Sequence, residues 1–270
     1  MKKLMAIIMA CLTAVACCFA LTACGDSTNV GVQQGTTGFA YASSIKGVNV
    51  KSYENPTLAA QDLKNGKIEY IIVDGATAKS VVANVEGLKV IDIALTSEEY
   101  AIGVDKNQEE LLNKINNVFV TKALEIAAIK AKYEAGLTEQ YKTVTSATKN
   151  TEAPETQLVV ATSASFAPFE YKSGNDYQGI DMEIAELIAN ELGLELVIED
   201  MDFDSVVSSI GKNGVDVAIA ALSVTASRKQ SINFSKAYYV ESQVIITLAS
   251  NDKLDSASTV VDVLQTLCGD

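Results

Sequence analysis

Short runs rich in valine and isoleucine alternate with helical patterns along the chain, and this alternation constrains the fold more than any other feature. Such runs are typical of strands buried in a parallel sheet, with the helices as right-handed crossovers. We therefore predict an α/β class, and 270 residues are enough for one large domain or two ordinary ones. The predicted strands are Val30–Gln33, Val48–Val50, Glu69–Asp74, Leu88–Ile93, Leu158–Thr162, Leu194–Glu199, Val215–Leu222 and Gln243–Leu248. Helices are predicted over residues 57–65, 76–84, 107–134, 181–192, 204–212 and 256–266.

A weak internal repeat suggests two lobes of similar build. Lys64–Ile72 parallels Lys212–Ile219, and each copy places a glycine between a helix and an apolar strand. This turn is common in α/β proteins, so the repeat alone leaves the number of lobes open. Residues 142–157 lie between the two copies. They are rich in Thr, Ser, Lys and Glu and have no apolar periodicity, which is typical of a solvated linker.

The composition excludes several classes of function. The chain has no histidine, which removes triads that depend on histidine and metal sites built on it, and we expect neither a metal nor a cofactor. The net charge of -13 repels phosphate backbones, so we expect no nucleic-acid partner. Cys268 is the only cysteine after Cys24, so no intramolecular disulfide is expected.

The first residues predict an export signal. Lys2 and Lys3 precede an uncharged, mainly apolar run that reaches Leu21, as in a secretory leader; a membrane-spanning helix is the alternative. The ending Leu21–Cys24 resembles the bacterial lipobox, which implies cleavage before Cys24 and attachment of lipid to its sulfur. We thus expect a signal peptide over residues 1–23, a tether over 24–29, and anchoring to the outer face of the cell membrane.

Polar residues follow several predicted strands at their carboxyl ends, where open parallel sheets bind ligands. Gly35 with its neighbouring threonines could present backbone N–H groups to an anion, or form an ordinary turn. Asp74 is either a carboxylate at a strand tip or the N-cap of the next helix. Ser223 and Arg228 could hold one carboxylate together, or be a cap and a surface arginine.

Most of the chain resembles the amino-acid-binding subfamily, family 3, of type II periplasmic (extracellular) solute-binding proteins. Residues 158–250 resemble the N-terminal part of the family through Val159–Glu170, Gly179–Ala185, Met201–Asp204, Ser223–Thr225 with Arg228, and Asn233–Ser235 with Tyr238–Tyr239. Residues 30–134 resemble its C-terminal part through Val32–Gly38, Leu63–Lys67, Val73–Asp74 and Glu98–Val104. The resemblance implies a two-lobe periplasmic-binding-protein-like fold of type II.

The two parts stand in the reverse of the family's order, which implies a circular permutation; a gene-assembly artefact is the alternative. The second lobe would then comprise residues 30–97 plus 245–270. The first lobe would comprise residues 98–244, including hinge crossings near Tyr100 and Glu241 and the linker at 142–157. Cys-Gly-Asp occurs both at 24–26 and at 268–270, on the two sides of the implied opening.

The resemblance assigns ligand contacts to five residues of the first lobe. Phe166 and Phe203 would pack against the side chain of a bound amino acid. Ser223 and Arg228 would hold its α-carboxylate, and Ala221 would offer a backbone carbonyl.

Five further positions complete the implied site. From the second lobe, Thr36 and Thr37 would add N–H and hydroxyl donors, and Asp74 would accept hydrogen bonds from the α-ammonium group. Gln33 and Ser163 sit where the family tunes selectivity for the ligand side chain. Ser163 is uncharged, which argues mildly against a strictly cationic ligand.

The implied function is that of a lipoprotein that captures a free amino acid by closure of its lobes and delivers it to the permease subunits of an ABC importer. It would act as a monomer and perform no chemistry on the ligand. A sensory module without a transporter is one alternative, and a dehydratase-like enzyme using Glu170 or Asp74 is another. Glu98, expected at a surface crossing between the lobes, should play no part in binding.

Overall fold

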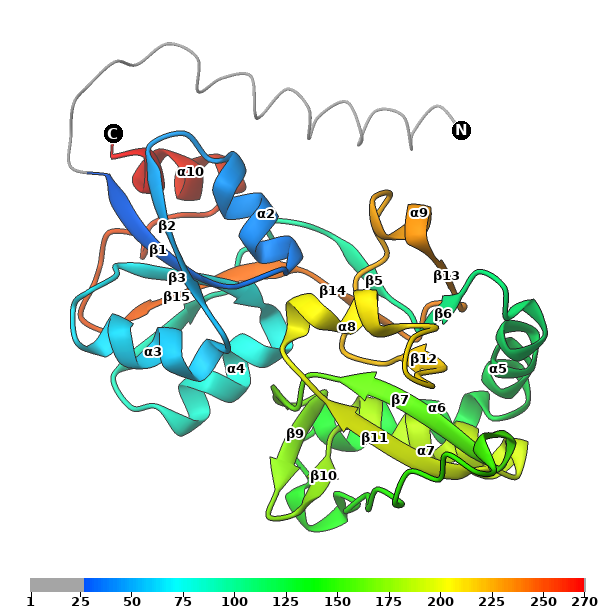
Figure 1. Cartoon of the computed structure of the whole chain (residues 1–270). Helices are drawn as coiled ribbons and strands as arrows, with labels where there is room; N and C mark the ends of the chain where they lie inside the picture. Colours follow the sequence, from blue (N-terminus) through cyan, green and yellow to red (C-terminus); the bar gives the residue numbers. More distant parts are fainter. Residues whose placement is uncertain (1–26, 270) are drawn as a thin grey trace.

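The structure is a computed structural model that describes residues 27–269. The predicted signal peptide, the predicted lipid acceptor Cys24 and the first half of the tether, residues 24–26, lie outside the described residues. Within residues 27–269, two five-stranded sheets with their helices form two α/β lobes (Figure 1). No helix in this part of the chain has the length and apolar character needed to cross a membrane.

The sheet of the second lobe has the strand order β2-β1-β3-β15-β4. Its strands are β1 (Thr28–Gln33), β2 (Val48–Tyr53), β3 (Tyr70–Asp74), β4 (Leu88–Ile91) and β15 (Gln243–Leu248). Strands β2 and β3 run parallel to β1, whereas β15 is antiparallel to both of its neighbours. A strand from the far end of the chain therefore lies inside a sheet begun at residue 28.

The two faces of this sheet are covered by different helices. Alternate side chains of β3 point to opposite faces. Tyr70 and Ile72 join the apolar cluster that includes α2 (Thr37–Ser44) and α10 (Val260–Cys268). Ile71 and Val73 belong to the cluster with α3 (Pro56–Lys64) and α4 (Gly75–Asn84). Every residue of β3 is buried, as its apolar sequence predicts.

The sheet of the first lobe has the order β11-β7-β12-β6-β13. Its strands are β6 (Gly103–Asp105), β7 (Gln157–Thr162), β11 (Glu195–Asp200), β12 (Val217–Ala218) and β13 (Ile232–Phe234). Helices α5 (Glu109–Thr121), α6 (Ala123–Glu134) and α7 (Ile180–Leu192) join the larger apolar cluster, and α8 (Phe203–Ser209) joins a separate one. The remaining elements are α9 (Arg228–Ser231), a small sheet of β8 (Ser165–Phe166), β9 (Glu170–Ser173) and β10 (Asp176–Gln178), and two 3-10 turns, η2 (Thr138–Gln140) and η3 (Pro154–Thr156).

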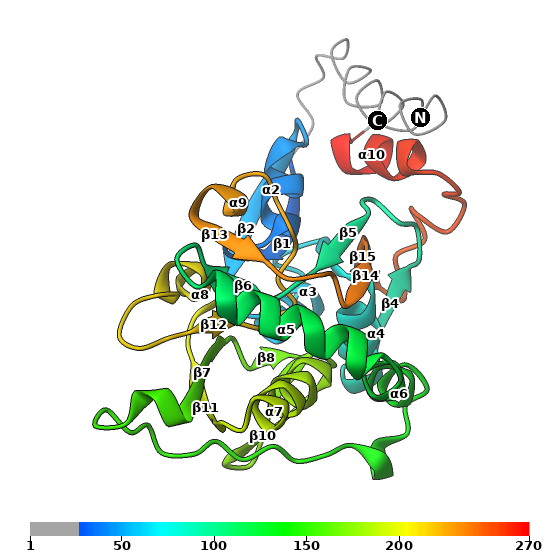
Figure 2. The same cartoon turned by 90° about the vertical axis from the view of Figure 1, so that its right-hand side faces the viewer.

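Two short strands carry the chain between the lobes. Strand β5 (Glu98–Tyr100) leads out of the second lobe, and β14 (Tyr239–Glu241) leads back into it. They pair antiparallel and lie between the two large sheets (Figure 2). Any relative movement of the lobes must therefore bend this ribbon.

Several predicted elements differ from the observed ones. The helix predicted over 107–134 is two helices, because Lys122 leaves helical geometry (φ -110°, ψ 21°) between α5 and α6. Of the strand predicted over Val215–Leu222, only Val217 and Ala218 pair, and Ala221 turns the chain with φ 44°. Segment 142–157 is mostly exposed, but Val144 is buried and exchanges two backbone hydrogen bonds with Tyr177.

Candidate functional site

A small pocket lies between the two lobes. It is lined by Gln33, Thr36, Thr37, Asp74, Phe166, Phe203, Ala220, Ala221, Ser223 and Arg228. The structure thus brings together every predicted ligand contact except Ser163, which is buried at the end of β7 outside the lining. Within residues 27–269, no cluster of histidine, cysteine, aspartate or glutamate suits a metal ion.

The turn after β1 supplies one wall. Gly35 adopts a positive φ of 76°, which favours glycine and lets the chain enter α2 at once. Thr36 is the N-cap of α2: its Oγ1 accepts from the N–H of Phe39 at 3.1 Å and donates to the carbonyl of Gln33 at 2.7 Å. The hydroxyl hydrogen of Thr36 is thus already used within its own turn.

Gln33 presents a fixed amide to the pocket. Its Nε2 donates to the carbonyl of Glu54 at 2.9 Å, which sets the orientation of the amide. Its Oε1 is buried and has no hydrogen-bond partner among residues 27–269. A buried acceptor without a donor is costly, so this oxygen favours a ligand that brings an N–H group.

Arg228 is held from both lobes. Its Nη1 donates to the carbonyl of Ser223 at 2.8 Å, and its Nη2 donates across the cleft to the carbonyl of Gly35 at 3.1 Å. The guanidinium carbon lies 5.4 Å from the centre of the Phe203 ring, a cation–π distance. Burial lowers the pKa of Arg228, and the negative charges of Glu98 and Asp74 oppose that shift.

Asp74 lies at the tip of β3 in a buried, acidic environment. Its Oδ1 accepts hydrogen bonds from the hydroxyl of Tyr100 and, at 2.9 Å, from the amide of Gln243. Burial raises the pKa of Asp74 to about 7, and the charges of Glu98 and Glu241 act in the same direction. Asp74 is also the N-cap residue of α4 by position, but its side chain makes no capping hydrogen bond; the carboxylate of Glu241 accepts from the N–H of Ala76 in the first turn instead.

Glu98 is the polar group that the sequence interpretation missed. Its Oε2 accepts hydrogen bonds from Thr37 Oγ1 at 2.6 Å and from Ser223 Oγ at 2.7 Å, and its Oε1 accepts from Thr96 Oγ1 at 2.8 Å. The expectation of an uninvolved surface residue is therefore wrong. Its place at the start of the matched stretch Glu98–Val104 was the available signal. A strand of three residues is too short, however, to show from its sequence which side chains point inward.

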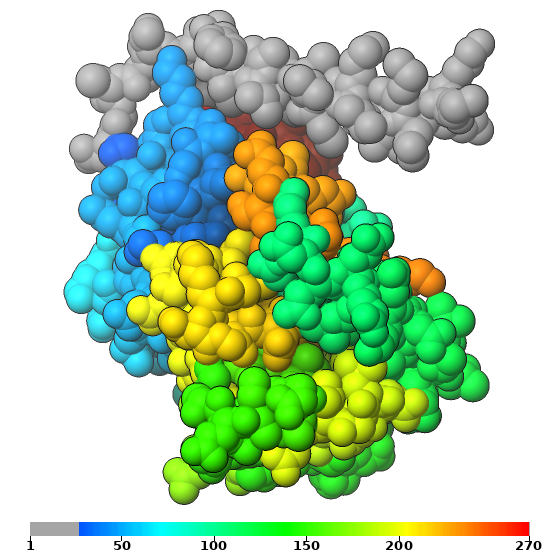
Figure 3. Space-filling model, turned by 45° about the vertical axis from the view of Figure 1, so that its right-hand side comes forward, coloured from blue at the N-terminus to red at the C-terminus, as the bar shows by residue number. Residues whose placement is uncertain are grey.

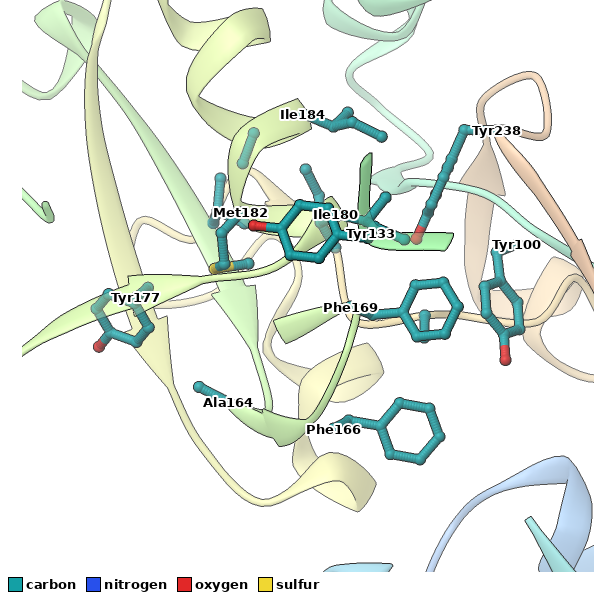
Figure 4. Close-up of a cluster of buried hydrophobic side chains, with 14 of the residues drawn as sticks. Tyr100, Tyr133, Ala164, Phe166, Phe169, Tyr177, Ile180, Met182, Ile184 and Tyr238 are labelled. Carbon is teal, nitrogen blue, oxygen red and sulfur yellow. The ribbon is translucent and has the colours of Figure 1, made fainter. Parts of the chain in front are cut away.

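Buried groups behind the pocket fix its first-lobe wall. The rings of Phe166, Phe169 and Tyr100 lie side by side, with Phe169 and Tyr100 edge to face at 5.2 Å (Figure 4). Asp181 Oδ2 accepts from the N–H of Ala221 at 2.7 Å and from the hydroxyl of Tyr238 at 2.8 Å, which secures the positive φ of Ala221.

Glu170 lies in this supporting layer. It is fully buried, outside the pocket lining, and burial beside Asp181 raises its pKa well above the usual range. Glu170 thus lies behind the wall of the pocket rather than on its surface.

The walls of the cleft meet directly. Gln34 Nε2 donates to Asp204 Oδ2 at 3.0 Å, from the second lobe to the first. The space-filling view shows the segments around residues 35 and 205 in contact over this region (Figure 3).

Two α/β lobes, two crossing strands and a polar pocket between the lobes define the two-lobe class of periplasmic-binding-protein-like folds. Residues 158–264 match the family model of bacterial extracellular solute-binding proteins, family 3. The match does not reach residues 30–134, so that part of the resemblance stays a prediction.

The curated relatives each match somewhat more than a third of the chain. The chain is 33% identical over 102 residues to the arginine-binding extracellular protein ArtP of Bacillus subtilis, covering 38% of this chain and 40% of the relative. It is 28% identical over 96 residues to the cyclohexadienyl dehydratase of Pseudomonas aeruginosa, covering 35% and 36%. The chain thus spans about two fifths of the length of these relatives. The GluR0 ligand-binding core in complex with L-glutamate aligns at 9% identity with a TM-score of 0.47, covering 90% of this chain and 92% of that one.

Proposed function

We propose that the protein is an exported substrate-binding protein that captures a free amino acid between its lobes for an ABC importer. One observation carries the proposal: a single pocket is lined by the carboxyl group of Asp74 from one lobe and the guanidinium of Arg228 from the other. A free amino acid carries an ammonium and a carboxylate close together, so these two groups match its opposite charges. The family match over residues 158–264 supports the same class.

Lobe closure follows from where these groups are attached. Arg228 and Ser223 belong to the first lobe, and Asp74 and Thr37 to the second. A ligand bound to one lobe alone leaves one of its charges without a partner. The ligand therefore favours the closed form, because only that form makes both sets of contacts.

The ligand in this proposal has a side chain with N–H donors. The unpartnered Oε1 of Gln33 supports this choice, since it needs a donor. Ser163 lies outside the pocket lining, so its neutral side chain no longer argues against a cationic ligand. The arginine-binding relative is consistent with this class.

The remaining features of the proposal rest on the sequence. The lipobox-like Leu21–Cys24 supports a lipid anchor at Cys24 on the outer face of the membrane, and the protein would act as a monomer. The reversed order of the two matched parts supports a circular permutation, with the second lobe at 30–97 plus 245–270 and the first lobe at 98–244.

A thermal-shift screen of the twenty amino acids against purified residues 25–270 tests the function. A ligand at one hundred times its dissociation constant stabilises the native state by about 2.7 kcal/mol, so a binder should raise the melting temperature clearly. No stabilisation by any amino acid would contradict the proposal. Recovering the ligand chemically unchanged after incubation separates a receptor from a dehydratase, and co-purification with permease subunits separates transport from sensing.

A further inference from the structure

Glu98 joins the two lobes at the pocket through one carboxylate oxygen. Thr37 belongs to the second lobe, Ser223 to the first, and both hydroxyls donate to Oε2 of Glu98, at 2.6 and 2.7 Å. The two hydroxyl oxygens are 3.4 Å apart, so the carboxylate caps a closely spaced pair of donors. Glu98 itself sits on β5, one of the two crossing strands.

The hydroxyls of Thr37 and Ser223 have no free hydrogen left to donate to the carboxylate of a ligand. A serine or threonine hydroxyl has a single hydrogen to donate. In Thr37 and Ser223 that hydrogen points to Glu98, so neither hydroxyl can donate to a second carboxylate at the same time. Both residues line the pocket. The negative charge of Glu98 is also the largest of the charges that oppose the lowering of the Arg228 pKa by burial. Hydroxyls and guanidinium are the groups that the proposed function assigns to the carboxylate of the ligand.

We infer that Glu98 is an internal competitor for the carboxylate of the ligand. The inference rests on the proposed function of the pocket. A bound amino acid must displace the Glu98 carboxylate from Thr37 and Ser223 before it can use their hydroxyls. Glu98 thus sets the affinity, and before displacement its carboxylate links the lobes across the cleft.

Calorimetry on Glu98→Ala and Glu98→Gln tests this, with L-arginine and L-argininamide as probes. Hydrogen bonds to charged groups are strong, so Glu98→Ala should bind L-arginine about tenfold more tightly than the wild type. Glu98→Gln should fall between them, because its amide oxygen still accepts but carries no charge. L-argininamide has no carboxylate and should gain little from either change. Unchanged or weaker binding of L-arginine by Glu98→Ala would overturn the inference while leaving the receptor function intact.

Glu99→Ala is the matched control. Glu99 is an exposed neighbour on the same strand, and Thr37 and Ser223 direct their hydroxyls to Glu98 rather than to it. It should bind both probes like the wild type. Circular dichroism melts of all three variants check that each one is folded.

Small-angle scattering without ligand gives a readout that does not depend on the receptor function. Loss of the carboxylate link should increase the radius of gyration of Glu98→Ala, but not that of Glu99→Ala. If L-arginine binds to no variant and the radius of gyration still increases, the ligand assignment fails and the link stands. If the radius is the same in wild type and Glu98→Ala, the contacts of Gln34 with Asp204 and of Arg228 with Gly35 hold the lobes without Glu98, and the link part of the inference fails.

Discussion

Asp74 combines two properties that oppose each other. Its carboxyl group is buried, which favours the neutral acid, yet the proposed ligand ammonium requires the carboxylate. A pKa of about 7 means that neutral pH populates both forms of Asp74. The residue therefore couples stability and binding to pH.

The stability of the unliganded protein should depend on Asp74 between about pH 4 and pH 7. The folded pKa is raised from 3.8 to about 7, so the folded state binds the proton more tightly than the unfolded state. The resulting stabilisation is complete below pH 4 and is lost as pH rises through 7. Asp74→Asn does not titrate, so its free energy of unfolding should fall less over this range. Urea titrations at a series of pH values measure both slopes; parallel curves would contradict the prediction.

Arg228 should be needed for ligand affinity. We expect Arg228→Ala to weaken amino-acid binding by about 2 kcal/mol or more, roughly thirtyfold, because a charged hydrogen-bond donor is removed from the pocket. Lys229→Ala, at the exposed neighbouring position, is the matched control. Isothermal calorimetry compares them, and equal affinities would place the binding site elsewhere.

The sequence predicts the positions of most site residues, but it does not predict all of their hydrogen-bond partners. Gln33, Asp74 and Ser223 end or follow strands, and the carboxyl ends of strands in two facing lobes converge. Thr37 and Ser223 can donate to Glu98 only in one rotamer of the Glu98 side chain, and the sequence of a three-residue strand does not indicate that rotamer. The bond from Gln243 to Asp74 joins residues 169 positions apart, and a local sequence pattern carries no information on such a pair.

At the level of elements, α7 begins where a hairpin and a helix come very close. Gly179 precedes the helix with φ 129°, and a Cβ there would lie 2.0 Å from the carbonyl oxygen of Phe169. The N–H of Gly179 also donates to the hydroxyl of Tyr133 at 3.0 Å. A side chain at this position cannot be accommodated by a rotamer change, because the obstacle is backbone.

Gly179→Ala should therefore destabilise the fold by at least about 3 kcal/mol. Gly193 ends the same helix at φ 69°, and a Cβ there meets nothing within 4 Å. Gly193→Ala should cost only the left-handed strain, about 1 kcal/mol. Urea unfolding of both variants measures the difference; similar losses would show that the clash at Gly179 is relieved.

The elements that could be predicted are the long and strongly patterned ones. The strands β1, β3, β7 and β15 and the helix α7 follow continuous apolar runs or clear amphipathic spacing. Strands β5, β6, β13 and β14 have three residues each, too few for an alternating pattern, and only pairing with distant segments makes them strands. Lys122 breaks the long helix without a proline or glycine, so no local signal marks it.

At the scale of the whole molecule, the two lobes share the chain in an interleaved way. Strand β6 lies between β12 and β13, and β15 lies between β3 and β4. A cut in segment 142–157 leaves an N-terminal piece with β1–β6 and a C-terminal piece with β7–β15. Each piece therefore holds strands of both large sheets.

A protease site inserted after Thr151, which is exposed, should be cleaved without separating the pieces. The two fragments should elute together in size-exclusion chromatography and retain the ligand affinity of the intact chain. Strand pairing in both large sheets holds the two fragments together, and the cleft lies away from the cut. Dissociation of the fragments without denaturant would contradict the strand pairing described for β6 and β15.

The central position of β15 also fixes an order of events during synthesis. A chain that leaves the ribosome N-terminus first completes β1, β3 and β4 long before Gln243–Leu248 exists. Until then β3 and β4 have unpaired edges, and the apolar faces of Ile71 and Ile72 lack part of their cover. Pairing across such sequence separations is slow, and exposed edges invite association with other chains. We therefore expect the nascent chain to be prone to association through these edges for most of its translation, and the sheet of the second lobe is complete only once β15 has been made.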